Sequence, residues 1–140
     1  MSFTFFTDRL GGYSQGDFSS LNLAQHVNDD ASAVLRNREL IAQKHGPTMY
    51  MNQVHGNDVV EVDEGSINLI TADALITRKR GLPLAVLSAD CLPILIKGEN
   101  IVGAIHAGRK GILNGIIERT ITKMRELGGN ELSATIGPAI

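Results

Sequence analysis

The single cysteine of this chain, Cys91, and two of its four histidines, His55 and His106, are the residues best suited to chemistry. Each stands at the end of a strand-like apolar run, where a side chain can face a cleft. One thiolate and two imidazoles form a three-ligand zinc shell with an open fourth position, the pattern of catalytic zinc. The same residue types can form a Cys–His nucleophilic pair. The spacing fits no short metal-binding motif, so a purely structural role for these residues also stays open.

Apolar patterns predict the elements that would position these residues. One helix should follow the N-caps Asn28, Asp29 and Asp30 and run through Lys44, and a second should span 111–127. The predicted strands are 3–6, 48–54, 59–62, 74–77, 82–89, 92–97, 101–106 and 132–136. The continuously apolar runs 84–87 and 94–96 suggest strands that are covered on both faces. The expected fold is α+β (layered α/β), a mixed β-sheet packed with helices in a single domain over residues 1–140.

Composition and charge limit the classes of partner. The net charge of −2 and the pI near 6.0 argue against a nucleic-acid or anionic-membrane partner, because such partners need a basic face. A single cysteine rules out an intrachain disulfide and favours a reducing compartment. Neither a signal peptide nor an apolar run of membrane-spanning length is present in the sequence. The expected location is therefore the cytoplasm.

Short motifs that follow one another along the chain make its sequence distinctive. They are FTDRLGG (6–12), SLNL (20–23), HVNDD (26–30), NQVHG (52–56), ADAL (72–75), ADCLP (89–93), HAG (106–108) and IGPAI (136–140). With these motifs the chain resembles the YfiH family over essentially its whole length. That family has also been called a polyphenol oxidoreductase "laccase domain" family, a peptidoglycan-editing-factor family and a purine nucleoside phosphorylase family.

The resemblance implies that His55, Cys91 and His106 are zinc ligands. It also implies a cytoplasmic enzyme whose partners are purine nucleosides and phosphate. The family's activities are phosphorolysis of adenosine, inosine, guanosine and methylthioadenosine, and deamination of adenosine. Two other readings stay open: a copper-binding polyphenol oxidoreductase, since one Cys and two His also suit a blue-copper centre, and a non-catalytic metal-binding fragment.

The chain departs from the family pattern in two places. Arg109 and Lys110 stand where the family usually has Trp and Arg, so an aromatic wall is replaced by a cation, and a planar fork by an ammonium. Family chains also continue past the IGPAI motif. Part of the sheet and of the pocket wall is then expected in a C-terminal segment that is missing here. An unpaired strand at 132–136 would favour self-association.

Cationic residues are the candidates for phosphate binding. Arg109 and Lys110 precede the predicted second helix, where free N–H groups and the helix dipole also attract anions; a solvated helix start is the alternative. Arg9, beside Gly11 and Gly12, is a second candidate anion contact, although a loop arginine can also be simply solvated.

Three polar residues near the presumed ligands are candidates for a supporting role. Asp73 and Asp90 could protonate or orient a base, or could hydrogen-bond a ligand imidazole; the second role is favoured for Asp90, because it adjoins Cys91. Gln53 should lie on the same side of its strand as His55. There it would either read the base or pair with backbone.

Overall fold

The structure is a computed structural model that describes residues 2–64 and 69–140. The chain divides into two compact units: an N-terminal unit, residues 5–48, and a sheet unit, residues 2–4 and 49–140. The class predicted from sequence, a mixed sheet packed with helices, is confirmed. The extent of the domain, residues 1–140 as one domain, stays a prediction.

The N-terminal unit contains a short 3-10 helix, η1 (Gly16–Phe18), and one α-helix, α1 (Ala31–His45). The Asp30 carboxylate accepts a hydrogen bond from the Ser32 N–H at 3.1 Å and so caps the start of α1. Gly46, with a φ of 93°, ends the helix. The helix predicted from the caps and the apolar face is therefore confirmed.

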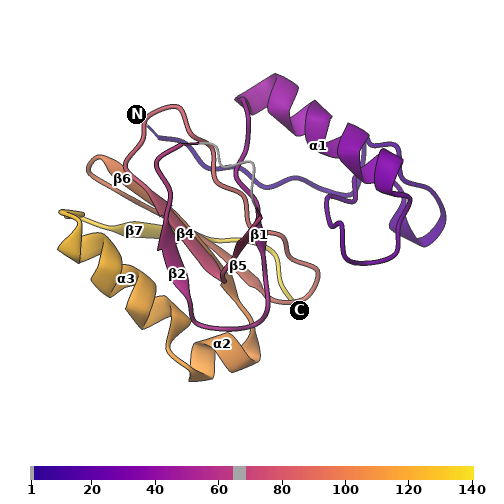
Figure 1. Cartoon of the computed structure of the whole chain (residues 1–140). Helices are drawn as coiled ribbons and strands as arrows, with labels where there is room; N and C mark the ends of the chain where they lie inside the picture. Colours follow the sequence, from indigo (N-terminus) through magenta and orange to yellow (C-terminus); the bar gives the residue numbers. More distant parts are fainter. Residues whose placement is uncertain (1, 65–68) are drawn as a thin grey trace. The chain divides into compact units, whose positions relative to one another are not determined.

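The sheet unit is built on a five-stranded sheet of order β2-β4-β6-β5-β7 (Figure 1). The parallel pair is β2 with β4, and the remaining neighbours are antiparallel. β1 and β3 form a separate two-stranded parallel sheet. The bounds are β1 (Met51–Asn52), β2 (Val59–Glu61), β3 (Ile70–Thr71), β4 (Ala74–Thr77), β5 (Leu92–Gly98), β6 (Ile101–Ala107) and β7 (Ser133–Ile136).

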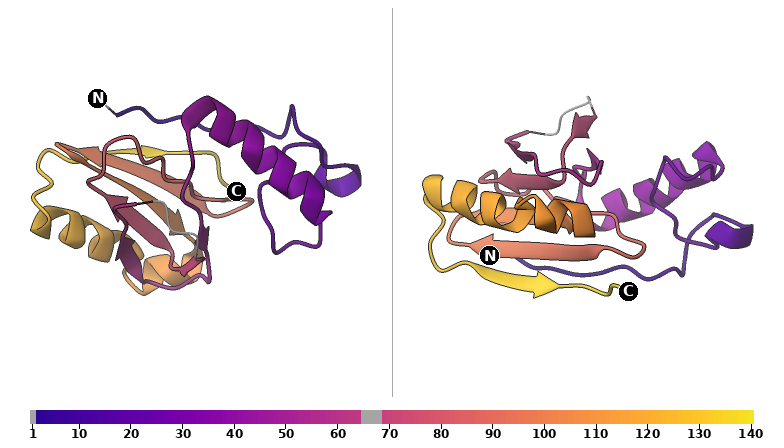
Figure 2. Two further views of the ribbon diagram at one scale, coloured as in Figure 1. Left: turned by 45° about the horizontal axis from the view of Figure 1, so that its top comes forward. Right: turned by 90° about the horizontal axis from the view of Figure 1, so that it is seen from below.

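Both faces of β4 are buried. Ala74 and Ile76 pack in one apolar cluster with Ile105 and with α3 (Ile116–Glu126), which runs along that face of the sheet (Figure 2). Leu75 points to the opposite face and belongs to a second cluster, with Met49, Met51, Val62 and Ala72. The inner strands are thus fixed by packing on two sides, which gives the ends of β4 and β6 a rigid base.

The helix predicted at 111–127 is two helices, α2 (Arg109–Leu113) and α3. Gly115 separates them, because its φ of 85° lies in the left-handed region that glycine adopts without steric cost. Arg109 and Lys110 consequently lie in the first turn of α2 and do not precede a long helix.

Strand predictions hold where neighbouring strands pair and fail elsewhere. The predictions at 59–62, 74–77, 92–97, 101–106 and 132–136 agree with β2, β4, β5, β6 and β7 to within one residue. Segment 3–6 forms no strand, and 48–54 contains only β1 and an isolated bridge from Met49 to Leu84. Segment 82–89 contains only that bridge; Pro83 lacks an N–H group, and beyond Ala85 the segment is held by the side chain of Gln53.

Across residues 2–64 and 69–140, every helix is too short or too polar to cross a membrane.

Candidate metal centre

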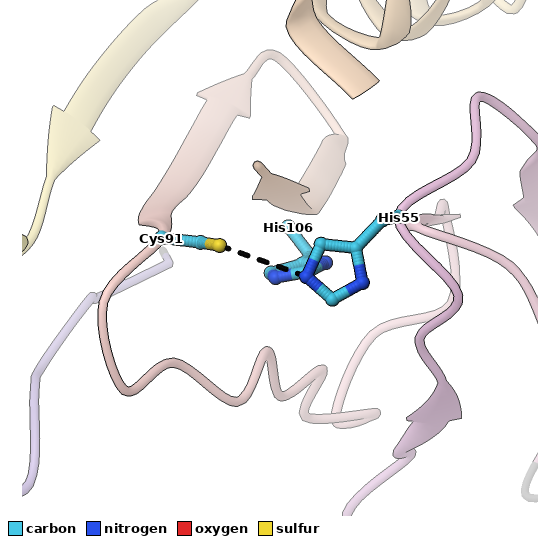
Figure 3. Close-up of side chains that lie close together, drawn as sticks. All are labelled: His55, Cys91 and His106. Atoms are coloured by element: carbon cyan, nitrogen blue, oxygen red, sulfur yellow. Dashed lines mark hydrogen bonds between the residues drawn. The ribbon is translucent and has the colours of Figure 1, made fainter. Parts of the chain in front are cut away.

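His55, Cys91 and His106 meet where β5 begins and β6 ends (Figure 3). Their candidate ligand atoms all lie within 4.8 Å of one another, and Cys91 Sγ is 3.8 Å from His55 Nε2. The two imidazole rings are 4.7 Å apart and nearly perpendicular, at 76°. His106 is buried, Cys91 half-buried and His55 exposed, so the cluster is open to solvent on the His55 side.

The sheet register explains this meeting of distant residues. Leu92 of β5 pairs with Ala107 of β6, so Cys91, directly before β5, lies beside the end of the strand that carries His106. His55 comes from the turn after β1, and its φ of 59° is unusual for a residue other than glycine.

A single buried carboxylate, that of Asp73, contacts both histidines. Its Oδ2 lies 2.7 Å from His106 Nδ1 and accepts the backbone N–H of His55 at 3.0 Å. Its Oδ1 accepts the backbone N–H groups of Val54 at 3.1 Å and Gly56 at 2.8 Å. Burial raises the pKa of the Asp73 carboxyl, but the hydrogen bonds from His106, Gly56, Val54 and His55 outweigh it and leave the pKa below its ordinary 3.8. Asp73 is therefore an ionised acceptor.

The donor set fits a zinc ion. Because Asp73 occupies Nδ1 of His106, the Nε2 of that ring is left as its metal-binding atom. Zinc holds sulfur at about 2.3 Å and nitrogen at about 2.0–2.1 Å in tetrahedral geometry, which places the two donors about 3.5 Å apart. The separation of 3.8 Å between Cys91 Sγ and His55 Nε2 is close to that value. A fourth position would stay open for water or substrate.

Gly108 closes the space beside the cluster, and sequence reasoning missed this role. A methyl group at Gly108 would lie 2.9 Å from His55 Cδ2 and 3.2 Å from Cys91 Sγ. Any side chain at this position would therefore push His55 or Cys91 out of its present place. The signal in the sequence was the glycine of the His-Ala-Gly motif, but its contact partners are set by the fold.

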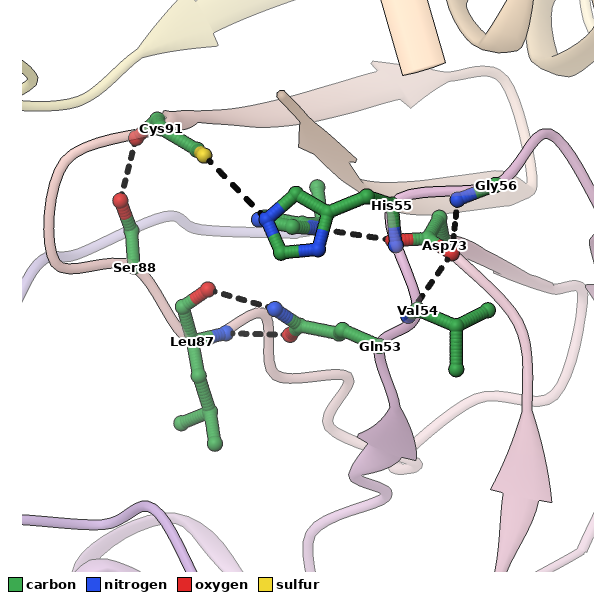
Figure 4. A network of polar contacts seen from close by, with 9 residues as sticks. Gln53, Val54, His55, Gly56, Asp73, Leu87, Ser88 and Cys91 are labelled. Carbon is green, nitrogen blue, oxygen red and sulfur yellow. Dashed lines mark hydrogen bonds and ion pairs between the residues drawn. The ribbon is translucent and has the colours of Figure 1, made fainter. Parts of the chain in front are cut away.

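Gln53 holds the segment that leads to Cys91 (Figure 4). Its amide donates to the carbonyl of Leu87 at 2.8 Å, and its carbonyl accepts the Leu87 N–H at 2.8 Å. The Ser88 hydroxyl donates to the carbonyl of Cys91. Of the two roles expected for Gln53, the structure shows the pairing with backbone.

The structure places the imidazole contact on Asp73 and not on Asp90. Asp90 is exposed, and within the described part of the chain no hydrogen bond joins its carboxylate to a histidine. Asp73 is completely buried, which leaves it no surface for direct contact with a substrate.

The cationic candidates lie in different places. Arg109 and Lys110 are exposed in the first turn of α2, next to Gly108. Arg9 belongs to the N-terminal unit, where its Nε donates to the carbonyl of Ser19 at 3.2 Å. The anion-binding roles of these three residues stay predictions.

Known proteins resemble this chain in sequence and in fold. The sequence model of a family described as multi-copper polyphenol oxidoreductase laccase matches residues 3–140. A purine nucleoside phosphorylase of Corynebacterium glutamicum is 43% identical over 145 residues, which cover 96% of this chain and 59% of that protein. One from Streptomyces coelicolor is also 43% identical, with 96% and 60% covered.

Solved structures of similar sequence share the fold of this chain. A Neisseria meningitidis protein superposes with a TM-score of 0.87 at 41% identity and covers 94% of this chain and 55% of its own. YlmD from Geobacillus stearothermophilus gives 0.85 at 32% identity, with 94% and 56% covered. The chain thus spans less than two thirds of the length of these relatives.

Proposed function

Because this chain belongs to the multi-copper polyphenol oxidoreductase laccase family, and its relatives there include purine nucleoside phosphorylases, we propose that it is a zinc-dependent purine nucleoside phosphorylase with adenosine deaminase side activity. The observation that carries this proposal is the group of His55, Cys91 and His106, whose ligand atoms lie within 4.8 Å of one another. The proposed substrates are phosphate and adenosine, inosine, guanosine or methylthioadenosine. The proposed location is the cytoplasm.

The three ligands would hold the ion, and the surrounding residues would keep them in place. When bound there, zinc supplies a Lewis acid that polarises a substrate oxygen or lowers the pKa of water. Asp73 fixes the ring of His106 by the 2.7 Å contact to Nδ1. The exposed Arg109 and Lys110 are the proposed phosphate contacts, since their cationic side chains are free to face solvent beside Gly108.

The test is base release by purified, zinc-loaded protein. Adenosine with phosphate should yield adenine and ribose 1-phosphate, with inosine as a side product, measured by chromatography. His106→Ala should abolish both reactions, and His26→Ala, a histidine outside the ligand group, should leave them intact. The double substitution of Arg109 and Lys110 by Ala should raise the phosphate requirement while sparing deamination. Equal loss of both reactions in that double variant would argue against a dedicated phosphate site.

The absence of base release from every purine nucleoside would instead favour a non-catalytic metal-binding fragment. In that case His55, Cys91 and His106 would still bind one ion, and Cys91→Ala would lose it. Metal content that is unchanged by Cys91→Ala would contradict the ligand assignment itself.

A copper-dependent polyphenol oxidoreductase is the second candidate, favoured by the description of the family. One Cys and two His suit a blue-copper centre. More than one copper ion needs more than one ligand set, however, and the described residues contain one group of this kind. Intense visible absorption after copper loading, together with rapid phenol oxidation, would favour the oxidase.

A further inference from the structure

We propose that Asp73 is the positioning residue for both histidines of the cluster, setting the tautomer of His106 and the backbone conformation of His55. The inference rests on the proposed function only in taking the two histidines as metal ligands. The positioning itself concerns the protein without substrate. It follows from four contacts that converge on one buried side chain.

The tautomer of His106 follows from the chemistry of its partner. Both carboxyl oxygens of Asp73 already accept backbone N–H groups, so the 2.7 Å contact to Oδ2 is one more accepted bond and places a proton on His106 Nδ1. The neutral ring then carries its lone pair on Nε2. Both side chains are buried, 4% exposed for His106 and 0% for Asp73, so water does not compete for this contact. Asp73 thereby leaves the only free nitrogen of His106 available to a metal ion.

The conformation of His55 depends on the same carboxylate. The N–H groups of Val54, His55 and Gly56 all donate to Asp73, and the middle residue has a φ of 59°. Such a φ is unfavourable for a residue with a side chain and persists when surrounding contacts fix it. Among the described residues, Asp73 is the side chain that binds these three successive amides. It therefore holds the turn that presents the His55 ring to Cys91.

Asp73→Asn separates these roles with almost no change in size. If the amide nitrogen took the place of Oδ1, its N–H groups would oppose the N–H groups of Val54 and Gly56, and neither backbone group can give up its proton. Placed with its nitrogen at Oδ2, the amide would face His55 N–H and His106 Nδ1. His106 can relieve its own part of that conflict by moving its proton to Nε2, which leaves one opposed N–H group, that of His55, against two in the first orientation. The second orientation should therefore prevail, and it puts a proton on the nitrogen that would bind metal.

The experiment is long-range proton–nitrogen NMR on histidine-labelled, metal-free protein at a pH where His106 is neutral. The wild type should show the proton on Nδ1, and Asp73→Asn should move it to Nε2. Zinc affinity, measured by competition with a chelator, should fall about 10–100-fold. Amide exchange at residues 54–56 should accelerate while β5 and β6 stay protected. Thr120→Val, which removes a buried hydroxyl bonded to the carbonyl of Ile116, is the control and should change none of these.

A wild-type His106 with its proton on Nε2 would overturn the inference without any variant, and so would an unchanged tautomer in Asp73→Asn. If that variant does not fold, the wild-type spectrum still decides. The wild-type tautomer is measured without metal or nucleoside, so the inference can hold even if the protein releases no base from a nucleoside. Failure of the proposed function is therefore distinguishable from failure of this inference.

Discussion

At the scale of single residues, Gly108 sets how closely the chain approaches the cluster. Gly108→Ala should destabilise the protein by about 1–3 kcal/mol and weaken zinc binding, because the new methyl group would press on His55 and Cys91. The φ of −78° suits alanine, so the effect would be steric. Unfolding curves and chelator competition measure the two effects.

The matched control is Gly81→Ala. Gly81 has open space around it but a φ of 76°, so alanine there should cost about 1–2 kcal/mol of backbone strain with no change in zinc affinity. If both variants lower zinc affinity equally, the contact of Gly108 with the ligands is not what matters.

Asp29 gives the N-terminal unit a dependence on pH. Its carboxylate accepts the Ser14 hydroxyl at 2.6 Å and the Asn22 amide at 3.0 Å, and these bonds lower the pKa of Asp29 below 3.8. A lowered folded-state pKa gives stability that is complete above the unfolded-state pKa and lost as pH falls through the folded one. In thermal unfolding, the stability of the wild type should fall as the pH is lowered below about 4. Asp29→Asn should make this fall smaller. A loss of equal size in the variant would assign the effect to other carboxyls.

The residue types of the site were predictable from sequence, but their supporting contacts were not. Cys91, His55 and His106 were identified as a chemical set, and the structure brings them together. The sequence leaves two roles open for Asp73 and favours an imidazole contact for Asp90, because Asp90 adjoins Cys91 in the chain. Contact between His106 and Asp73 instead depends on the pairing of β4 with β6, which spacing alone does not reveal.

At the scale of elements, the side chain of Gln53 holds the middle of the segment from 82 to Cys91 through the backbone of Leu87. Gln53→Ala would leave the N–H and carbonyl of Leu87 without their partner, at a cost of about 1–3 kcal/mol. Hydrogen exchange of a peptide covering 84–91 should accelerate, and zinc affinity should fall with it. Asn52→Ala, which removes an exposed contact to Thr71, is the control and should leave the peptide unchanged. Unaltered exchange in Gln53→Ala would show that other contacts hold the segment.

The sequence pattern located elements whose partners are local or whose faces are both apolar. β5 and β6 join through a turn at Asn100, with a φ of 59°, and β4 is apolar on both sides. Segment 82–89 is equally apolar but gains little backbone pairing. Its apolar residues Leu82, Leu84 and Val86 pack on the second cluster without strand geometry. Apolar content predicts burial, whereas a strand needs a neighbour with free hydrogen-bonding groups.

At the scale of the whole molecule, the outer strand β7 is the most exposed part of the sheet. Its four residues are all exposed, including Ile136 at 59%, and in the described part of the chain it pairs only with β5. Exposed apolar edge strands promote association. This chain should therefore self-associate in dilute solution, as measured by sedimentation velocity, and Ile136→Lys should reduce that association.

The control for this prediction is Leu113→Lys. Leu113 is 78% exposed on α2, outside the sheet, so a charge there should leave association unchanged. A monodisperse wild-type monomer would contradict the prediction outright, and equal effects of both substitutions would assign the association to general apolar surface.

The contacts of Asp73 also join parts of the chain that are distant in sequence. Its partners His55 and His106 are 18 and 33 residues away in the chain. The backbone N–H of His106 donates to the carbonyl of Asp73 at 2.8 Å, so the ligand ring is aligned only when the strands β4 and β6 have come together. Closing these loops costs chain entropy before any contact forms. A metal ion held by both histidines would therefore bind only after these strands have paired, and its rate of uptake in a refolding experiment would report that pairing.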